Sequence, residues 1–361
     1  MVTSQINYEE LVAAPPYSLE QDKKDKIFQK IMLQLTKHHY KNCALYKRLL
    51  DAFEVDVSNG FAPKEIPFIP VRLFKEYDLV SVDKGKIVKT ITSSGTSNQG
   101  KSRINLDRHT SVLQSKSLSK IVCSFTEAKR LPLLIFDSKS ILREKASISA
   151  RSAGILGFSL LSRDLSFALD DEMKLDFDEI DSFCVRNKDK KVLVFGFTYI
   201  LWKHLYLELE KAGTMLPLDQ GILFHGGGWK HLVDQQIGAR EFKKSIERVT
   251  HIQRIHNYYG MAEQTGSIFV ECQFHNLHCP IYSDIKILRP DFSQCAIGEV
   301  GLVQVDSILP WSYPGHSVLT EDRGEILGID DCPCGRLGKY VRIHGRIENS
   351  EIKGCSDSYA R

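Results

Sequence analysis

The chain has 361 residues, of which 42% are apolar and 26% are charged, and its formal net charge is +3. This length allows one large globular domain or two of ordinary size. Because basic residues are scattered among nearly as many acidic ones, the composition does not indicate a nucleic-acid partner.

The N-terminus has neither the basic start nor the apolar stretch of a signal peptide. No run reaches the roughly 18 apolar residues of a membrane span. The longest run, 192–202, is expected to be a buried strand that leads into the next element. Nine cysteines, an odd number, without an export signal favour reduced thiols, which serve as metal ligands or reactive groups. We therefore expect a cytoplasmic protein without a membrane span.

Apolar residues in 18–55 recur at helical spacing and predict two helices, which the proline-marked segment 66–70 brings to an end. Residues 86–91 are expected to form a strand. Short apolar runs then alternate with helical patterns; the runs are 131–136, 192–197 and 221–224, and the helical patterns are 199–211 and 239–249. This alternation predicts an α/β sheet covered by helices.

From residue 281 onward the pattern changes to short strands and turns, which indicates a smaller β-rich lobe. The expected strands are 285–288, 299–305, 325–329 and 340–343. The predicted organisation has four parts: an N-terminal helical segment (1–65), an α/β core (66–280), the β-rich lobe (281–340) and a hinge-like C-terminal tail (341–361).

A loop rich in Ser, Gly and Thr comes after the predicted strand at 86–91 and is the first candidate site. Its small side chains, hydroxyl donors and accessible backbone N–H groups suit the phosphates of a nucleotide, and the lysine at its end could neutralise charge. The residues expected to contact phosphate are Ser93, Ser94, Gly95, Thr96, Ser97 and Lys101.

Besides a phosphate loop of an adenylate-forming enzyme, the same loop can be interpreted as a Walker A motif or as a surface turn. Gly95, four residues and then Gly100, Lys101 and Ser102 formally match a Walker A motif. A Walker loop should lead directly into a helix, yet 103–107 alternates as a strand does. A strand, a hydroxyl-rich loop and a second strand is instead similar to the arrangement in adenylate-forming enzymes. A surface turn without a ligand is the third interpretation.

Four downstream motifs could hold the other parts of ATP. Three glycines after a predicted strand would let a flat base approach the backbone. Glu263, beside a glycine turn and an aromatic ring, could ligate Mg²⁺. Asp322 could bind the ribose hydroxyls, and Arg346 could add a cation near the α-phosphate or the ribose. The residues expected to contact the nucleotide here are Gly226, Gly227, Gly228, Tyr259, Gly260, Met261, Ala262, Glu263, Asp322 and Arg346. The glycines alone could instead form a tight strand-to-helix turn, and each of the last two motifs alone would more often be a solvated turn.

Together and in this order, the motifs resemble those of the superfamily of adenylate-forming acyl/aryl-CoA synthetases and luciferases. Three segments are similar, more narrowly, to the acyl-protein synthetases of bacterial bioluminescence, the long-chain-fatty-acid–luciferin-component ligases. They are 225–230 (His-Gly-Gly-Gly-Trp-Lys), 312–316 (Ser-Tyr-Pro-Gly-His) and 351–357 (Glu-Ile-Lys-Gly-Cys-Ser-Asp). Phenylacetate-CoA ligases are a more distant match. The resemblance extends from about residue 66 to the C-terminus.

The resemblance implies an α/β fold, namely the large N-terminal domain of the adenylate-forming enzymes with a smaller β-rich lobe. Typical members continue into a mobile C-terminal domain of roughly a hundred residues, whereas this chain stops at Arg361, so we expect that domain to be absent or vestigial. The implied cofactors are ATP and Mg²⁺. The cation that assists adenylation stays open between Lys353 and Lys230.

The implied reaction is ATP-dependent activation of a carboxylic acid, expected to be a fatty acid, to acyl-AMP with release of pyrophosphate. The acyl group would then pass to a cysteine thiol. The resemblance points to Cys355 as the acylated residue, against an inert surface cysteine. The expected catalytic residues are Cys355, Lys353 and Glu263. The acid is expected to contact Phe197, Thr198, His225 and Trp229. The expected partners are a fatty or aryl carboxylic acid and an acyl-accepting or reductase protein.

Two clusters of cysteine and histidine suggest a structural metal. Cys332 and Cys334 are close enough to clamp one ion, and Cys272 and His278 lie some 50 residues earlier. Four such ligands would close a tetrahedral zinc site that pins the β-rich lobe. The alternative is free cysteines in a tight turn.

Three other functions remain open. An acyl/aryl-CoA or carrier-protein ligase would use the same chemistry with another thiol. A Walker-type NTPase or kinase would release phosphate without any acid. A catalytically inactive scaffold is the third, although the joint presence of Lys101, Glu263 and Asp322 argues against it.

Overall fold

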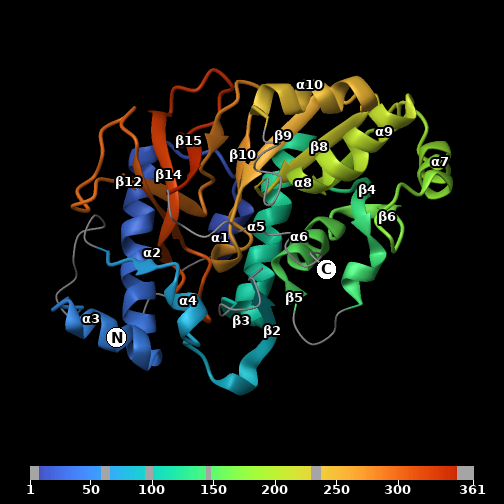
Figure 1. The fold of residues 1–361 in the computed structure, drawn as a ribbon. Coiled ribbons are helices and arrows are strands. Elements are labelled where there is room, and N and C mark those ends of the chain that lie inside the picture. Colours follow the sequence, from blue (N-terminus) through green and yellow to red (C-terminus); the bar gives the residue numbers. More distant parts are fainter. Residues whose placement is uncertain (1–7, 58–65, 94–100, 144–147, 229–236, 348–361) are drawn as a thin grey trace. The chain divides into compact units, whose positions relative to one another are not determined.

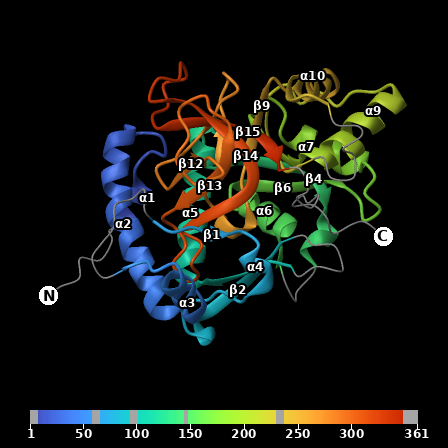
Figure 2. The same ribbon diagram turned by 60° about the vertical axis from the view of Figure 1, so that its left-hand side comes forward.

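The computed structural model describes residues 8–57, 66–93, 101–143, 148–228 and 237–347. They form two compact units, each traceable by colour in Figures 1 and 2. Unit 1 comprises 8–57, 66–93, 101–121 and 260–347, and unit 2 comprises 122–143, 148–228 and 237–259. These units differ from the four sequential segments expected. Residues 66–121 pack with C-terminal strands because a short strand at Ile69–Pro70 adds to one of them.

Unit 1 begins with α1 (Tyr8–Ala13), α2 (Gln21–Asn42) and α3 (Ala44–Ala52). The two helices expected in 18–55 are thus confirmed. Helix α2 forms because its apolar residues recur on one face, where Phe28, Ile31 and Leu35 are buried. Figure 2 shows α2 running alongside the strands of unit 1.

The sheet of unit 1 has the order β12-β13-β14-β15-β11-β10, and β1 (Ile69–Pro70) pairs in parallel with β14. The strands are β10 (Phe269–Glu271), β11 (Leu277–His278), β12 (Ser283–Leu288), β13 (Gly301–Ser307), β14 (Ser317–Ile329) and β15 (Lys339–Arg346). All four expected strands are confirmed, and the one at 325–329 is the second half of the long β14.

A separate hairpin carries the candidate phosphate loop. Strands β2 (Ile87–Thr92) and β3 (Arg103–Asp107) pair antiparallel, with Thr92 opposite Arg103. Helix α5 (Arg108–Thr126) comes directly after β3. The short elements before the hairpin are α4 (Leu73–Glu76) and η2 (Lys84–Lys86).

Unit 2 is a parallel sheet of order β9-β8-β7-β4-β6. Its strands are β4 (Leu131–Ser138), β6 (Ser162–Leu169), β7 (Val192–Phe197), β8 (Gly221–Gly226) and β9 (Arg254–Tyr259), besides the two-residue β5 (Ile148–Ser149). The helical elements are η3 (Lys139–Leu142), α6 (Ala150–Ser159), α7 (Phe177–Arg186), α8 (Thr198–Ile200), the π-helical η4 (Leu201–Tyr206), α9 (Leu207–Ala212) and α10 (Ala239–Thr250). The expected α/β alternation is confirmed.

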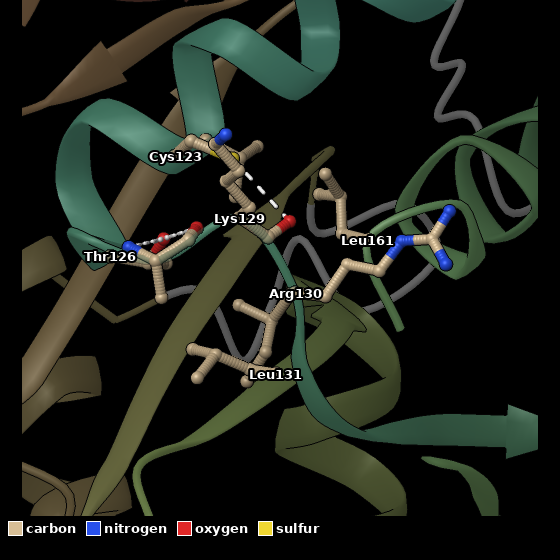
Figure 3. A pocket seen from close by; sticks show the side chains of 9 residues that line it. Cys123, Thr126, Lys129, Arg130, Leu131 and Leu161 are labelled. Atoms are coloured by element: carbon tan, nitrogen blue, oxygen red, sulfur yellow. Dashed lines mark hydrogen bonds between the residues drawn. The ribbon is translucent and has the colours of Figure 1, made fainter. Parts of the chain in front are cut away.

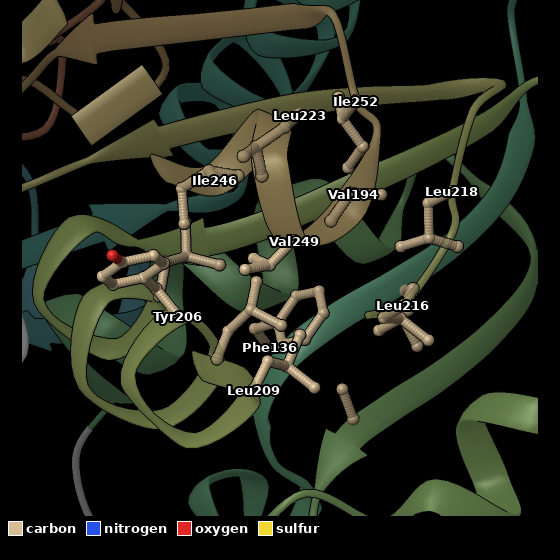
Figure 4. Packing of buried hydrophobic residues seen from close by; sticks show 14 of the residues in the cluster. Phe136, Val194, Tyr206, Leu209, Leu216, Leu218, Leu223, Ile246, Val249 and Ile252 are labelled. Carbon is tan, nitrogen blue, oxygen red and sulfur yellow. The ribbon is translucent and has the colours of Figure 1, made fainter. Parts of the chain in front are cut away.

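Side-chain alternation along the strands explains why helices cover both faces of this sheet. On one face, Val194 and Leu223 pack against residues of η4, α9 and α10, such as Leu209 and Ile246 (Figure 4). On the other face, Phe195 and Phe224 contact the ring of Phe158 in α6. Because helices cover both faces of the sheet, a ligand site is expected at the carboxyl ends of its strands.

A buried ion network joins the N-terminal helix to the sheet of unit 1. The Asp284 carboxylate accepts hydrogen bonds from Lys24 at 3.2 Å and from Lys339 at 2.7 Å. All three side chains are at least nine-tenths buried. The two lysines lower the pKa of Asp284, despite the opposing effect of burial, so the network stays charged and fixes α2 on the strands.

No helix in the described ranges is long and apolar enough to cross a membrane.

A pair of buried imidazoles should make the stability of unit 1 dependent on pH. His316 stacks on His39 and contacts Thr36 Oγ1 at 3.1 Å. Burial lowers the pKa of His316 to about 3. Between that value and the ordinary value near 6.5, the unfolded chain binds a proton that the folded chain does not. The free energy of unfolding therefore falls as the pH falls, by about 1.4 kcal/mol per pH unit for this group.

We predict that His316→Gln will make the pH dependence between pH 6 and 4 less steep by about that amount, about 1.4 kcal/mol per pH unit. Urea unfolding at a series of pH values measures the slope. An unchanged slope in the variant would contradict the assignment.

Candidate functional site

The base of the candidate phosphate loop is closed by two serines. The backbone N–H of Ser102 donates to Ser93 Oγ at 3.0 Å, and the N–H of Ser93 donates to the Ser102 carbonyl at 3.1 Å. Lys101 is exposed. The loop leads into strand β3 rather than into the helix that a Walker loop requires. The expected contacts Ser94, Gly95, Thr96 and Ser97 lie outside the described residues.

The turn that carries Glu263 is a short 3₁₀-helix, η6 (Ala262–Gln264), fixed by buried hydrogen bonds. The Tyr313 hydroxyl donates to the Glu263 carbonyl at 2.8 Å. The Gln264 amide donates to the carbonyls of Val305 at 2.8 Å and Gly315 at 2.9 Å. Two segments that resemble family motifs, 259–263 and 312–316, are therefore bonded to each other.

The end of this turn requires a glycine. Gly266 has φ +86°, and a Cβ at this position would lie 2.6 Å from the backbone of Gln114 in α5. One residue earlier, Thr265 Oγ1 donates to Gln114 Oε1 at 2.8 Å. The close approach of the two backbones thus sets the distance between the Glu263 turn and α5.

The Glu263 carboxylate is buried, with 6% of the residue exposed. Burial raises the pKa of Glu263, while Ser102, Lys75 and Arg346 lower it. The Ser102 hydroxyl is itself buried and lies close enough to the Glu263 carboxyl to lower its pKa. A buried carboxylate with a hydroxyl close to it and two cations near enough to lower its pKa suits a site for a divalent cation and phosphate.

Asp322 and Arg346 come together on neighbouring strands, since they are directly opposite in the β14–β15 register. The adjacent Glu321 accepts from Arg72 Nε at 2.6 Å and lies 3.8 Å from Arg346 Nη1. No sequence pattern indicates Arg72 or Lys75 as site residues, because nothing in their spacing relates them to a motif about 250 residues later. Glu321 lies inside the expected motif at 320–322, although only Asp322 is expected to bind the nucleotide.

In unit 2, two of the three glycines at the end of β8, Gly226 and Gly227, lie against aromatic rings. A Cβ on Gly226 would lie 2.7 Å from the Tyr258 ring, and Gly227, at φ +84°, would bring one within 3.3 Å of Phe197. Gly228 has no neighbour within 4 Å. Tyr259 is half-buried at the end of β9. Open backbone beside aromatic rings is consistent with the expected base-binding role.

Thr198 and His225 are brought together at the carboxyl ends of β7 and β8. Thr198 Oγ1 lies 2.9 Å from His225 Nδ1 and 3.2 Å from the Gly226 carbonyl oxygen, and its single proton can be donated to either. Burial, with smaller effects of Lys243 and His256, lowers the pKa of His225 to about 3, so the imidazole is neutral. Its Nε2 makes no hydrogen bond to any described residue.

Aromatic rings fill the space beside these residues. Phe195 stacks on Phe158 with centroids 4.0 Å apart and meets Phe197 edge-on at 5.5 Å. Of the four residues expected to contact the acid, Phe197, Thr198 and His225 are therefore neighbours, and Trp229 lies outside the described residues.

A hollow in unit 2 lies at the opposite end of the strands. It is lined by Cys123, Thr126, Leu131 and Leu161, among others (Figure 3), and its volume is about 10 Å³, which is room for about one water molecule. Ligand pockets measure about 300–1,000 Å³. The Cys123 thiol is directed to the Lys129 carbonyl at 3.7 Å. This hollow is too small to be the acid site.

The four residues expected to bind zinc are clustered in unit 1. One ligand atom from each of Cys272, His278, Cys332 and Cys334 lies within 4.8 Å of all the others. The sulfurs of Cys272 and Cys332 are 4.0 Å apart, and Cys334 Sγ is 3.2 Å from His278 Nε2. Zn–S bonds of about 2.3 Å place tetrahedral ligands roughly 3.8 Å apart, so the four atoms have the right spacing.

The surroundings of the cluster also suit a metal. Burial lowers the pKa of His278 to about 4, which leaves the ring neutral and able to ligate. Burial raises the pKa of Cys334, but the N–H of Arg336 and the Cys332 side chain outweigh it and lower the value below that of a free thiol. The N–H of Phe274 donates to the sulfur of Cys272 at 3.4 Å. The remaining expected catalytic residues, Lys353 and Cys355, lie outside the described residues, as does Lys230.

Comparison with known proteins identifies the family. The model of the family "Acyl-protein synthetase, LuxE" matches residues 1–361. The chain belongs to the LuxE acyl-protein synthetase family. The resemblance found in the motifs is thereby confirmed, and with it the expectation that the chain is a ligase-type enzyme.

Two relatives are long-chain-fatty-acid–luciferin-component ligases. The protein of Photorhabdus luminescens is 32% identical over 108 residues, which cover 30% of this chain and 91% of the relative. The protein of Vibrio harveyi is 22% identical over 357 residues, which cover 96% of this chain and 90% of the relative.

Crystal structures of 2-hydroxyisobutyryl-CoA ligase share the fold. One, in complex with R3-HIB-AMP, has a TM-score of 0.70 at 16% identity and covers 92% of this chain and 69% of its own. Another, in complex with 2-HIB-AMP and CoA, has a TM-score of 0.71 at 15% identity, and the match covers 93% of this chain and 70% of the ligase chain. The expected α/β fold of the adenylate-forming ligases is confirmed.

The close approach at Gly266 yields a stability prediction for this LuxE-family chain. Gly266→Ala should lower the free energy of unfolding both because the backbone there is left-handed and because the added Cβ meets Gln114. The loss should be about 2 kcal/mol larger than for the same substitution at a left-handed glycine without neighbours. Gly298, at φ +81° with nothing within 4 Å, provides that control as Gly298→Ala. Urea unfolding compares the two. Equal losses of stability would contradict the packing described.

Proposed function

We propose that this protein activates a fatty acid with ATP to give acyl-AMP and pyrophosphate, and then transfers the acyl group to the thiol of Cys355. The observation that carries the proposal is the buried Glu263 carboxylate, whose pKa Ser102, Lys75 and Arg346 lower, on a turn that Tyr313 holds by a hydrogen bond to the Glu263 backbone carbonyl. Membership of the acyl-protein synthetase family supports the same chemistry.

In the first step, a carboxylate oxygen of the acid attacks the α-phosphorus of ATP, and the bond to the pyrophosphate oxygen breaks. No proton needs to move, because the negative charge of the carboxylate and ATP is shared between acyl-AMP and pyrophosphate. The residues have to orient the two anions and stabilise the charge that develops on the phosphoryl oxygens.

Each motif has a proposed part in binding ATP. Glu263 would hold Mg²⁺, which when bound neutralises phosphate charge. Asp322 would accept hydrogen bonds from the ribose hydroxyls, and Arg346 would lie near the ribose or the α-phosphate. The phosphate loop would supply backbone N–H groups and Lys101. The backbone of Gly226–Gly228 and the ring of Tyr259 would contact the adenine.

The acid would be oriented by neutral groups at the carboxyl ends of β7 and β8. His225 is buried and its Nε2 has no hydrogen-bond partner within the described ranges. When the Thr198 hydroxyl donates to Nδ1, the neutral imidazole carries its proton on Nε2 and can donate it to a carboxylate without forming a fixed ion pair, so the nucleophile stays reactive. Phe197 would contact the acyl chain, and Trp229 is proposed as a further contact.

In the second step, the Cys355 sulfur attacks the acyl carbon, the bond from that carbon to the phosphate oxygen breaks, and AMP leaves with its charge. The thiol proton passes to solvent. The thioester would then be delivered to an acyl-accepting or reductase protein.

Acylation of the protein tests this function. We predict that labelled fatty acid with Mg²⁺ and ATP will label the wild-type band after denaturing electrophoresis, and that Cys355→Ser will abolish the label. Cys123→Ser serves as the control, because Cys123 is a half-buried thiol bonded to the Lys129 carbonyl. An unlabelled wild-type band would contradict the proposal, and label that persists in Cys355→Ser would move the acceptor elsewhere.

We also infer that Cys272, His278, Cys332 and Cys334 hold a structural Zn²⁺. Four protein ligands close the coordination shell and leave no position for substrate or water. The residues fit the ion in type and in spacing. The metal would stabilise the β-rich part of unit 1 by joining β11 to the turn at Cys332.

Metal analysis of the purified protein tests the zinc site. About one Zn²⁺ per chain is expected, and Cys332→Ser should lose it and several kcal/mol of stability. Cys295→Ser, at a buried cysteine outside the cluster, should retain the metal. Wild-type protein without zinc after expression in zinc-supplemented medium would contradict the inference.

A further inference from the structure

The cation that assists adenylation is the missing part of the proposed mechanism. The two candidates from the sequence, Lys353 and Lys230, lie outside the described residues. The segment 69–76 contains another lysine, which lies near the Glu263 turn.

This segment is aligned on the strand that carries the expected ribose contact. Strand β1 pairs in parallel with β14, with Pro70 opposite Leu319. The N–H of Val71 donates to the Leu319 carbonyl at 2.9 Å. The chain thus reaches α4 (Leu73–Glu76) beside the part of β14 that leads to Asp322.

Two side chains then fix α4, one to the strand that carries Asp322 and the other to the segment that holds the Glu263 turn. Arg72 Nε donates to Glu321 at 2.6 Å, next to Asp322. Phe74 is buried and meets the Tyr313 ring edge-on, with centroids 6.2 Å apart. Tyr313 in turn donates to the Glu263 carbonyl at 2.8 Å. The next residue, Lys75, is held by its neighbours at a defined place beside the Glu263 turn.

The electrostatics agree with this placement. Lys75 is half-buried, and its charge is close enough to lower the pKa of the Glu263 carboxyl. Arg72 is bonded to Glu321, and Arg346 lies 3.8 Å from the same carboxylate. Both arginines are thus directed toward the Glu321 side of the site. A lysine is a compact charge on a flexible stem, which suits contact with a phosphoryl oxygen that moves during reaction.

We propose that Lys75 is the catalytic cation of the adenylation step, and that its ammonium group contacts the α-phosphate oxygens of ATP as the acid attacks. The contact stabilises charge on those oxygens while the bond to pyrophosphate breaks, and the lysine neither gains nor loses a proton. This role rests on the proposed function, in which Glu263 places Mg²⁺ and the phosphates beside it.

Acid-dependent exchange between pyrophosphate and ATP tests the role of Lys75. Lys75→Met keeps the aliphatic stem and removes the charge, so folding should be retained. It should lower kcat of exchange about 100-fold, as loss of one charge-stabilising donor does, with a much smaller change in the KM for the acid. Lys75→Arg should retain part of the activity. Lys86→Ala is the matched control, because Lys86 is an exposed lysine paired with Asp83 in the same region.

Chemical rescue separates a catalytic charge from a structural one. Ethylammonium should restore part of the lost exchange activity of Lys75→Ala, whereas sodium at the same ionic strength should not. If the wild-type protein catalyses exchange and Lys75→Met retains all of that activity, the role of Lys75 is overturned but the proposed function is not. Loss of activity without any rescue by ethylammonium and with lowered thermal stability would also overturn the role of Lys75. Absence of exchange in the wild-type protein would overturn the proposed function itself.

Discussion

The hydrogen bond from the Tyr313 hydroxyl to the Glu263 carbonyl fixes the part of unit 1 on which the candidate site depends. Burial raises the pKa of Tyr313, so the phenol remains a donor at all relevant pH values. The preceding Ser312 donates to the Asn105 carbonyl in β3 at 2.8 Å. Phe74 packs on the ring of Tyr313 itself. The candidate magnesium ligand, the strand after the phosphate loop and the helix of Lys75 are thus all positioned by one buried segment.

Local patterns in the sequence predicted the elements and the motifs. The alternation in 103–107 was sufficient to expect a strand rather than the helix of a Walker loop, and β3 confirms it. Cysteine and histidine spacing named four residues that the structure brings within 4.8 Å of one another. Both patterns are short in sequence or chemically distinctive, so no knowledge of the tertiary structure was needed.

Contacts between distant segments could not be predicted. Arg72 and Glu321 are 249 residues apart, and a single arginine after a proline-marked segment has no distinguishing pattern. The same holds for Lys24 and Asp284, which are 260 residues apart and form a buried ion pair that Lys339 joins. The unit boundaries were missed for the same reason, since strand β1 joins a sheet whose other strands lie some 200 residues later. Long-range pairing, rather than local propensity, decides these features.

The proposed mechanism depends above all on Glu263 placing Mg²⁺ on the phosphates of ATP. Titration calorimetry of ATP with wild-type protein and Glu263→Gln, each at low and high Mg²⁺, tests this role most directly. We expect Mg²⁺ to strengthen ATP binding to the wild-type protein, and Glu263→Gln to lose most of this dependence while still binding ATP. The same dependence on Mg²⁺ in both proteins would contradict the role of Glu263.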